Sequence, residues 1–475
     1  MIKRSTGLPL FILGIFLILF FSRVFQEGVF FDGLIYACLA NNLADGIGSF
    51  WFPLYSEMSP TVFYEHPTLA YGLESIFMEI FDGSLYTEKI YSFVMAVLMA
   101  LFIGLIWRKL FQGKSLQQLY WLPIFLWIIT PKIQWSYNNN MLENTMGMFT
   151  IASVYFLLVS INKIGWQKFL LIFLSAILLL LSFLSKGFPG LFPLGLFFLY
   201  WIFFNQNYSL NYFLKDFLLL FGLTFLVFFL LFYFNANSWK SITSYLDIQF
   251  IESVAGRSRV GSRLNIMKNL FNELIPFLIL ILIFFLSYRK RMLTLVKNQK
   301  QENKYALFFL TLGLCGSVPL MISPKLSSFY LVVALPYFAI SVAFFLSNTV
   351  NELVENLRSS KIGTAITKSF AVISIVVAIS LTIINYGTVG RDNDLISDLE
   401  KISTVVDDHS LISVHADYYQ DWTVMSYFQR YHQISFDVSG NLQSYHLVAK
   451  GSPVPENYEI LQLNLVQFDL LVSVN

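Results

Sequence analysis

Apolar runs long enough to cross a membrane recur along the whole chain. A hydrocarbon core roughly 30 Å thick needs about 17 to 25 consecutive apolar residues in a helix, and we predict about eleven such spans. They lie near 7–25, 90–107, 117–131, 143–161, 168–185, 188–204, 216–234, 271–288, 305–322, 329–346 and 369–386. The first run lacks a small-residue cleavage site, so we expect a retained anchor. The pattern predicts an all-α polytopic membrane protein.

The composition agrees with this class and argues against others. Of 475 residues, 56% are hydrophobic and only 13% are charged, against roughly a quarter charged in soluble proteins. The formal net charge is +2, so we expect no nucleic-acid partner. Cys38 and Cys315 are too few and too far apart for a disulfide framework or a thiolate metal site. We interpret both as packing residues.

Lysines and arginines in short loops predict the orientation, because they stay on the cytoplasmic side. Lys3 and Arg4 place the N-terminus inside. Alternate loops carry the other basic clusters: Arg108, Lys109 and Lys114; Lys163 and Lys168; Arg289, Lys290, Arg291, Lys297, Lys300 and Lys304; Arg358, Lys361 and Lys368. The outer side then holds 26–89, 131–142, 235–270, 323–328 and the tail from 387. We expect a multi-pass protein of the cell (inner or plasma) membrane with a cytoplasmic N-terminus and an extracytoplasmic C-terminus.

Two of these outer segments are more than connectors. Residues 26–89 form a long apolar loop in which helical spacing over 34–44 predicts a short amphipathic helix in the membrane interface. Residues 387–475 carry short apolar stretches at 411–414 and 470–474 among polar residues, which predicts a small α/β domain. We therefore divide the chain into a transmembrane unit, 1–386, and an extracytoplasmic domain, 387–475.

Acidic and polar residues gather on the predicted outer side. Asp32 follows the first span almost at once, where a carboxylate at the bilayer surface suits a transferase acting on a lipid and a helix N-cap is the plain alternative. Glu65 and His66 precede a proline, a pattern that is more often a turn. Asn140 and Glu143 lie where the fourth span opens, and a carboxylate there is costly unless paired.

Cations converge on the same side. Lys186 and Lys325 stand at the outer ends of spans, where snorkelling to the headgroups is the alternative. The loop at 235–270 breaks the charge rule with Lys240, Arg257, Arg259, Arg263 and Lys268. Together these cations suit the phosphate of a lipid headgroup.

The order of these motifs resembles the GT-C glycosyltransferases, most closely the aminoarabinose transferase and protein mannosyltransferase-like group. The resemblance covers about residues 7–346, and its more specific parts are Leu-Ser-Lys-Gly-x-x-Gly at 184–190 and Ser-x-Lys-x-x-x-Phe-Tyr-Leu-x-x-x-Leu-Pro at 323–336. It implies transfer of a sugar from a polyprenyl-phosphate donor to a lipid, glycan or protein acceptor. The resemblance also implies that the reaction runs on the outer face of the membrane, with inversion at the anomeric carbon.

The resemblance also implies roles for single residues. Asp32 matches the catalytic carboxylate and Glu143 the second acidic position, while His66 replaces a lysine that meets the donor phosphate in many relatives. The predicted site comprises Asp32 and Glu143 for catalysis; Lys186, Lys325, His66, Arg257, Arg259 and Arg263 for the donor phosphate; and Glu65, Asn140 and Tyr330 for substrate.

The proposed chemistry requires no cofactor, because a base and several cations suffice for a single displacement. Relatives can hold a metal near the glutamate of this motif, but Glu65 and His66 alone are too few ligands, so a divalent metal near Glu65 stays an alternative. Other functions also stay open: a glycan ligase or polymerase, a lipid-linked sugar transporter or flippase, and a non-catalytic assembly subunit. A transporter would need ionisable groups near the bilayer midplane and internal symmetry, whereas these charges gather at span ends.

Overall fold

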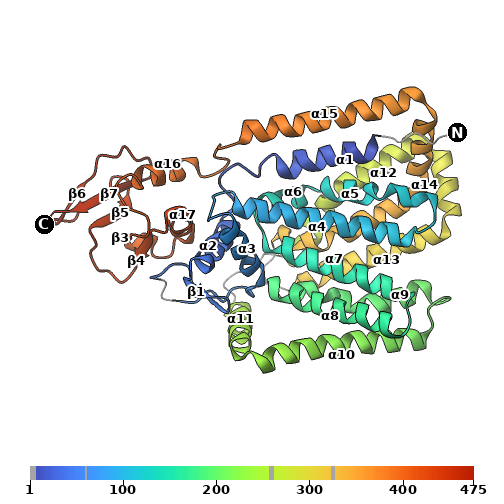
Figure 1. The fold of residues 1–475 in the computed structure, drawn as a ribbon, viewed down its shortest axis with the longest axis horizontal. Coiled ribbons are helices and arrows are strands. Elements are labelled where there is room, and N and C mark those ends of the chain that lie inside the picture. The colour runs from blue at the N-terminus through green and yellow to red at the C-terminus, as the bar shows by residue number, and fades with distance from the viewer. Residues whose placement is uncertain (1–6, 59–60, 256–261, 323–326, 475) are drawn as a thin grey trace.

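The chain folds into a bundle of long helices with a small sheet domain at one end (Figure 1). A computed structural model describes residues 7–58, 61–255, 262–322 and 327–474. Within these ranges, eight helices are long and apolar enough to cross a membrane. They are α4 (Thr87–Leu110), α7 (Leu142–Ser160), α8 (Gly165–Lys186), α10 (Leu210–Phe234), α12 (Asn265–Asn298), α13 (Lys300–Ser317, extended by a 3₁₀ turn, Val318–Ile322), α14 (Leu335–Ser359) and α15 (Lys361–Asn385). The protein is therefore a multi-pass integral membrane protein.

The remaining predicted spans are shorter or broken. Helix α1 (Leu8–Phe16) continues as a π-helical turn, Leu17–Phe21, and α9 (Leu196–Phe204) follows a 3₁₀ segment, Phe188–Gly195. The predicted span over 117–131 is shorter in the structure, because the segment holds the end of a 3₁₀ turn, Ser115–Leu119, and the eight-residue helix α5 (Trp121–Ile128). Helix α6 (Pro131–Asn138) starts anew after Thr130, whose ψ of 122° is extended. A proline disfavours helical backbone in the residue before it, which explains the break.

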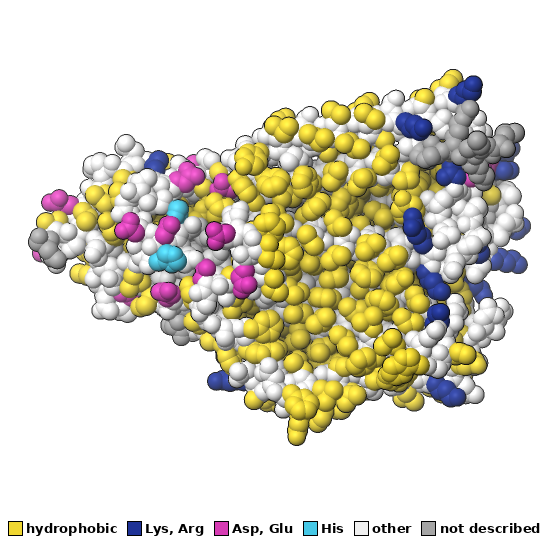
Figure 2. Space-filling model, in the orientation of Figure 1, with side chains coloured by type: hydrophobic (Ala, Val, Ile, Leu, Met, Phe, Trp, Pro, Cys, Tyr) yellow, Lys and Arg dark blue, Asp and Glu magenta, His cyan; other side chains and the backbone are white. Residues whose placement is uncertain are grey.

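The charged residues divide between the two ends of the bundle. Figure 2 shows an apolar belt over the helices, with lysines and arginines beyond it at one end and acidic residues on the C-terminal domain at the other. Predicted basic loops contact neighbouring helix ends: Lys114 Nζ lies 3.9 Å from Glu302 Oε1, and Arg291 Nε lies 2.9 Å from Glu352 Oε2. The basic loops share one end, as the charge pattern predicts.

The C-terminal domain contains a five-stranded sheet with the order β4-β3-β5-β7-β6. Strand β3 pairs in parallel with β4 and β5, while β7 pairs antiparallel with β5 and β6. The elements are α16 (Asn393–Ile402), β3 (Leu411–Val414), α17 (Trp422–His432), β4 (Ser435–Asp437), β5 (Tyr445–Ala449), β6 (Tyr458–Ile460) and β7 (Phe468–Ser473), with a 3₁₀ turn at Ala416–Tyr418. The predicted small α/β domain is confirmed, and the apolar stretches at 411–414 and 470–474 lie in β3 and β7.

The first long loop folds between the bundle and this domain. It forms α2 (Phe31–Ala44), the short strands β1 (Gly48–Ser49) and β2 (Phe52–Pro53), and α3 (Leu69–Ile80), while α11 (Ala236–Ala255) lies nearby (Figure 1). The helix predicted over 34–44 is present as α2, but its amphipathic, interfacial character is not: residues 33, 34 and 36–42 of α2 are buried inside the protein. Helices α3 and α17 both pack against α2. Side chains of α2, α3, α17 and the sheet form one hydrophobic cluster, so the loop and the C-terminal domain share a core.

Candidate functional site

A cavity of about 750 Å³ lies at the end of the bundle that carries the C-terminal domain. Six predicted site residues from segments far apart in sequence line it: Asp32, Glu65, His66, Glu143, Lys186 and Tyr330. Its apolar wall includes Met146, Phe188, Leu191, Phe192, Leu320 and Ile322. Charged groups and an apolar wall therefore meet in one space.

A buried ion pair stands in the cavity wall. Lys186 Nζ lies 2.7 Å from Glu143 Oε1, and the two side chains are only 6% and 0% exposed. The ammonium also lies 5.3 Å and 5.2 Å from the ring centroids of Phe329 and Tyr330, within the range of cation–π attraction. Glu143 opens α7 and Lys186 closes α8, so the ends of two packed helices bring the pair together.

Gly187, the residue after Lys186, sets the direction in which the chain leaves the end of α8. Gly187 has φ +97° and ψ −152°, a conformation essentially restricted to glycine. A Cβ at Gly187 would lie only 2.2 Å from Tyr245 Oη on α11. Gly187 thus ends α8 directly after the lysine and admits α11, which also lines the cavity through Tyr245, Leu246 and Gln249.

A second close approach brings Asp32 toward the start of α7. Gly33 packs so tightly that a Cβ there would lie 1.9 Å from the Asn139 carbonyl oxygen. The Phe30 N–H donates to Asn139 Oδ1 at 2.7 Å. The turn that precedes α7 therefore holds the first turn of α2, and the two predicted carboxylates, Asp32 and Glu143, line the same cavity.

Asn140 is not placed at the cavity, contrary to its predicted role in substrate binding. It is buried with φ +51° and is not among the lining residues. Its amide donates to Glu74 Oε1 at 2.8 Å and to the Gly33 carbonyl at 3.4 Å. Asn140 therefore connects the turn before α7 to α2 through Gly33 and to α3 through Glu74.

Sequence reasoning missed Tyr36, which lies one helical turn after Asp32 and lines the cavity. The spacing of four residues places both side chains on one face of α2, and this was the signal available. Burial, together with the negative charge of Asp32, raises the pKa of Tyr36 well above its ordinary value, so the phenol stays protonated. Its ring centroid lies 5.9 Å from that of His66.

The remaining predicted cations do not complete the site within the described residues. Arg263 is exposed in the turn before α12 and is not among the lining residues, so the structure does not bring it to the cavity. Lys325, Arg257 and Arg259 lie outside the described residues.

A metal centre is not defined by the described side chains. Glu65 and His66 both line the cavity, and Gln249 Nε2 donates to the Glu65 carbonyl at 3.1 Å. Within the described ranges, no group of three or more histidine, cysteine or acidic side chains is placed to hold an ion. A zinc-type site normally has three or four protein ligands, so a metal here would need ligands from elsewhere.

The fold is that of solved proteins of the polytopic GT-C type. The chain is similar to ArnT from Cupriavidus metallidurans in the apo state, with a TM-score of 0.65, 13% identity, and coverage of 98% of each chain. The ArnT structure bound to undecaprenyl phosphate gives the same score and identity over 99% of each chain. The archaeal oligosaccharyltransferase AglB from Archaeoglobus fulgidus, solved with an inhibitory peptide and a dolichol-phosphate, gives 0.53 at 12% identity over 93% of this chain and 69% of that one. No family model and no curated protein matches the sequence.

Proposed function

We propose that this protein is an inverting glycosyltransferase. It moves a hexose or pentose from a polyprenyl-phosphate donor to a lipid, glycan or protein acceptor on the outer face of the cell membrane. The observation that carries the proposal is the single cavity that joins Asp32 to the Glu143–Lys186 pair beside an apolar wall. Likeness to ArnT, one of whose structures is bound to undecaprenyl phosphate, supports it.

The proposed reaction is one displacement. Asp32 accepts the proton of the acceptor hydroxyl while that oxygen attacks the anomeric carbon. The bond between this carbon and the phosphate oxygen breaks, and the electron pair leaves with the polyprenyl phosphate. Lys186 stabilises the charge that grows on the leaving phosphate, an effect that is strongest where water is excluded. Glu143 holds the lysine in position through the ion pair.

The lining of the cavity suits a donor with a charged head and an apolar tail. Phe188, Leu191 and Phe192 lie on the same lining as the charged residues, so the first isoprene units can pack beside the headgroup. The basic loops stand at the opposite end of the bundle (Figure 2). Because basic loops remain in the cytoplasm, we place the cavity and the C-terminal domain outside.

The proposed step uses no metal, because Lys186 already supplies a positive charge at the phosphate. A divalent ion near Glu65 and His66 is the alternative. Full transfer in a chelator is the expected result, and loss of transfer that added Mg²⁺ or Mn²⁺ restores would establish the metal.

The test is to incubate the purified protein in liposomes with polyprenyl-phosphate hexoses and pentoses and a membrane extract as acceptor source. We expect release of polyprenyl phosphate and a glycosylated product, with both lost in Asp32→Asn. Movement of intact donor between leaflets without release would indicate a flippase instead. Release of polyprenyl diphosphate only from diphosphate-linked donors would indicate a ligase or polymerase.

A further inference from the structure

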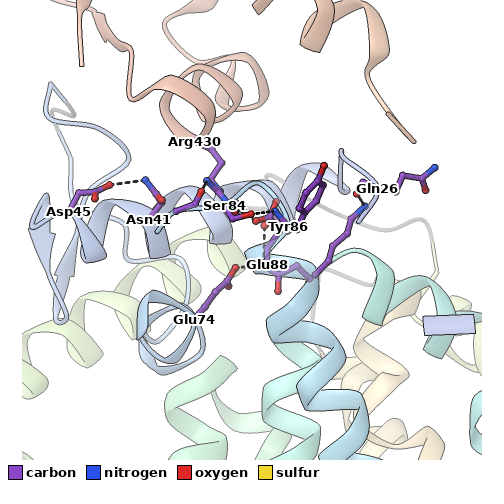
Figure 3. Close-up of polar contacts among 12 residues, drawn as sticks. Gln26, Asn41, Asp45, Glu74, Ser84, Tyr86, Glu88 and Arg430 are labelled. Carbon is purple, nitrogen blue, oxygen red and sulfur yellow. Dashed lines mark hydrogen bonds and ion pairs between the residues drawn. The ribbon is translucent and has the colours of Figure 1, made fainter. Parts of the chain in front are cut away.

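Arg430 of the C-terminal domain is buried against the corner between α3 and α4 (Figure 3). Its guanidinium donates to the carbonyls of Gly83 at 2.8 Å and Ser84 at 2.6 Å. It also lies 2.9 Å from Glu88 Oε2 at the start of α4, and the two side chains are only 1% and 6% exposed. Three acceptors around one planar fork fix both the position and the orientation of this corner.

The same corner and α17 hold the C-terminal end of α2. A Cβ on Gly83, where φ is +61°, would lie 3.1 Å from Asn41 Oδ1. Gln429, the neighbour of Arg430, donates to Asn42 Oδ1 at 3.1 Å. The Asn42 amide donates in turn to the carbonyls of Leu54 and Tyr55, each at 2.9 Å. These contacts leave the end of α2 little room to move.

The other end of α2 is reached through α3. Glu74 accepts from Asn140, which also donates to the Gly33 carbonyl beside Asp32. Figure 3 shows Glu74 and Glu88 close to each other below Arg430. Burial raises the pKa of Glu74 to about 8, the hydrogen bond from Asn140 lowers it, the charge of Glu88 raises it further, and the charge of Arg430 lowers it by the least. Arg430 and Glu74 thus belong to a set of contacts that reaches both ends of α2.

We propose that Arg430 is a positioning residue, through which the C-terminal domain fixes the tilt of α2 and hence the place of Asp32 in the cavity. The proposal rests on the proposed function, because it concerns the reaction at Asp32. Helix α2 has fourteen residues, and at 1.5 Å per residue it is a rod of about 20 Å. A tilt of about 3° at the C-terminal end would move Asp32 by about 1 Å, and a misplacement of this size can cost on the order of 100-fold in rate.

The decisive variant is Arg430→Lys, which keeps the charge beside Glu88 but has no planar fork for the two carbonyls. We expect kcat to fall about 10- to 100-fold while the KM for the donor stays within about twofold, since α2 is displaced and the phosphate site is not. The matched control is Lys450→Met, which removes an ion pair with Asp469 in the same domain, where the lysine is 52% exposed. Unchanged kcat in Arg430→Lys, or a loss confined to KM, overturns the proposal.

A second measurement separates positioning from general damage. In an Asp32→Asn background, Arg430→Lys should cause no further loss of rate, because the group that it positions is gone. A further loss of the same size overturns the proposal. Should Arg430→Lys fail to fold, Glu88→Gln weakens the same contact from the side of α4, since it removes the counter-charge of the guanidinium but keeps an oxygen that can accept. We then expect a smaller fall in kcat at an unchanged KM, and an unchanged kcat overturns the proposal.

Hydrogen exchange tests the coupling without turnover. Amides of residues 31–44 should exchange faster in Arg430→Lys than in the wild type, and at the wild-type rate in Lys450→Met. Unchanged exchange overturns the role of Arg430. Absence of transfer by the wild-type protein overturns the proposed function, so the two failures are distinguishable.

Discussion

Replacing Lys186 with methionine tests the buried ion pair most sharply. The change keeps an unbranched side chain of similar size but removes the ammonium that lies 2.7 Å from Glu143 Oε1. The variant therefore leaves the carboxylate of Glu143, which is fully buried, without a counter-charge. Removing one partner of a buried pair costs about 3–5 kcal/mol, so we expect a loss of this size in the free energy of unfolding.

The double variant Lys186→Met/Glu143→Gln separates stability from catalysis. It removes both charges, and neutral replacements of a buried pair are often nearly neutral in stability. We expect its free energy of unfolding to return to within about 1 kcal/mol of the wild type, which makes the two changes strongly non-additive. Transfer should stay lost in both variants, because the leaving phosphate lacks its cation in each.

Titration with SDS in mixed micelles measures the unfolding free energy, and released polyprenyl phosphate measures transfer. Wild-type stability in Lys186→Met would refute the buried pair. Transfer restored in the double variant would refute the role of Lys186 at the phosphate.

Three further predictions concern the carboxylate, the glycine turn and the buried acid of α3. Asp32→Asn should lower the transfer rate by roughly 10²- to 10⁴-fold at an unchanged melting temperature, and near-normal turnover would remove Asp32 from the mechanism. Gly187→Ala should cost roughly 1–3 kcal/mol in backbone strain and add a clash with Tyr245, whose hydroxyl lies 2.2 Å from the new Cβ; thermal unfolding should show partial recovery with Tyr245→Phe, and an unshifted transition would contradict the strain. Burial raises the pKa of Glu74 in the folded protein to about 8, above an unfolded value of about 4.3. The stability that Glu74 contributes is therefore full below about pH 4.3 and is lost as the pH rises through about 8. Glu74→Gln should flatten this pH dependence in melting curves from pH 5 to 9, and parallel curves for the two proteins would exclude Glu74 as its source.

Much of the fold was predictable because membrane helices leave a strong local signal. Length and hydropathy give α4, α7, α8 and the other long spans directly, and the placement of lysines and arginines sorts the loops to two ends. The short helix α6 (Pro131–Asn138) was missed because its eight residues include too few apolar ones to count as a span, and we assigned them to the outer segment 131–142. The burial of α2 was missed for another reason: its second covering layer, α17, lies almost 400 positions further along the chain.

The candidate site was predicted in part. Asp32, Glu143 and Lys186 stand at span ends on one side, and the bundle brings such ends together, so their convergence in one cavity follows from the topology. The sequence does not distinguish a substrate-binding role for Asn140 from a structural role, since a buried polar side chain near a membrane span is costly in both. The partners of Asn140 decide between the two roles, and Glu74 is its neighbour only in three dimensions. The pairing of Arg430 with Glu88 had no sequence signal for the same reason.

The most direct test of the central claim is an experimental structure of the protein with undecaprenyl phosphate bound. We expect the phosphate in the cavity, within hydrogen-bond distance of Lys186 Nζ and on the side that faces Asp32, with the first isoprene units against Phe188 and Phe192. A phosphate bound elsewhere, or a Lys186 that points away from it with the ion pair to Glu143 unchanged, would refute the proposed donor site.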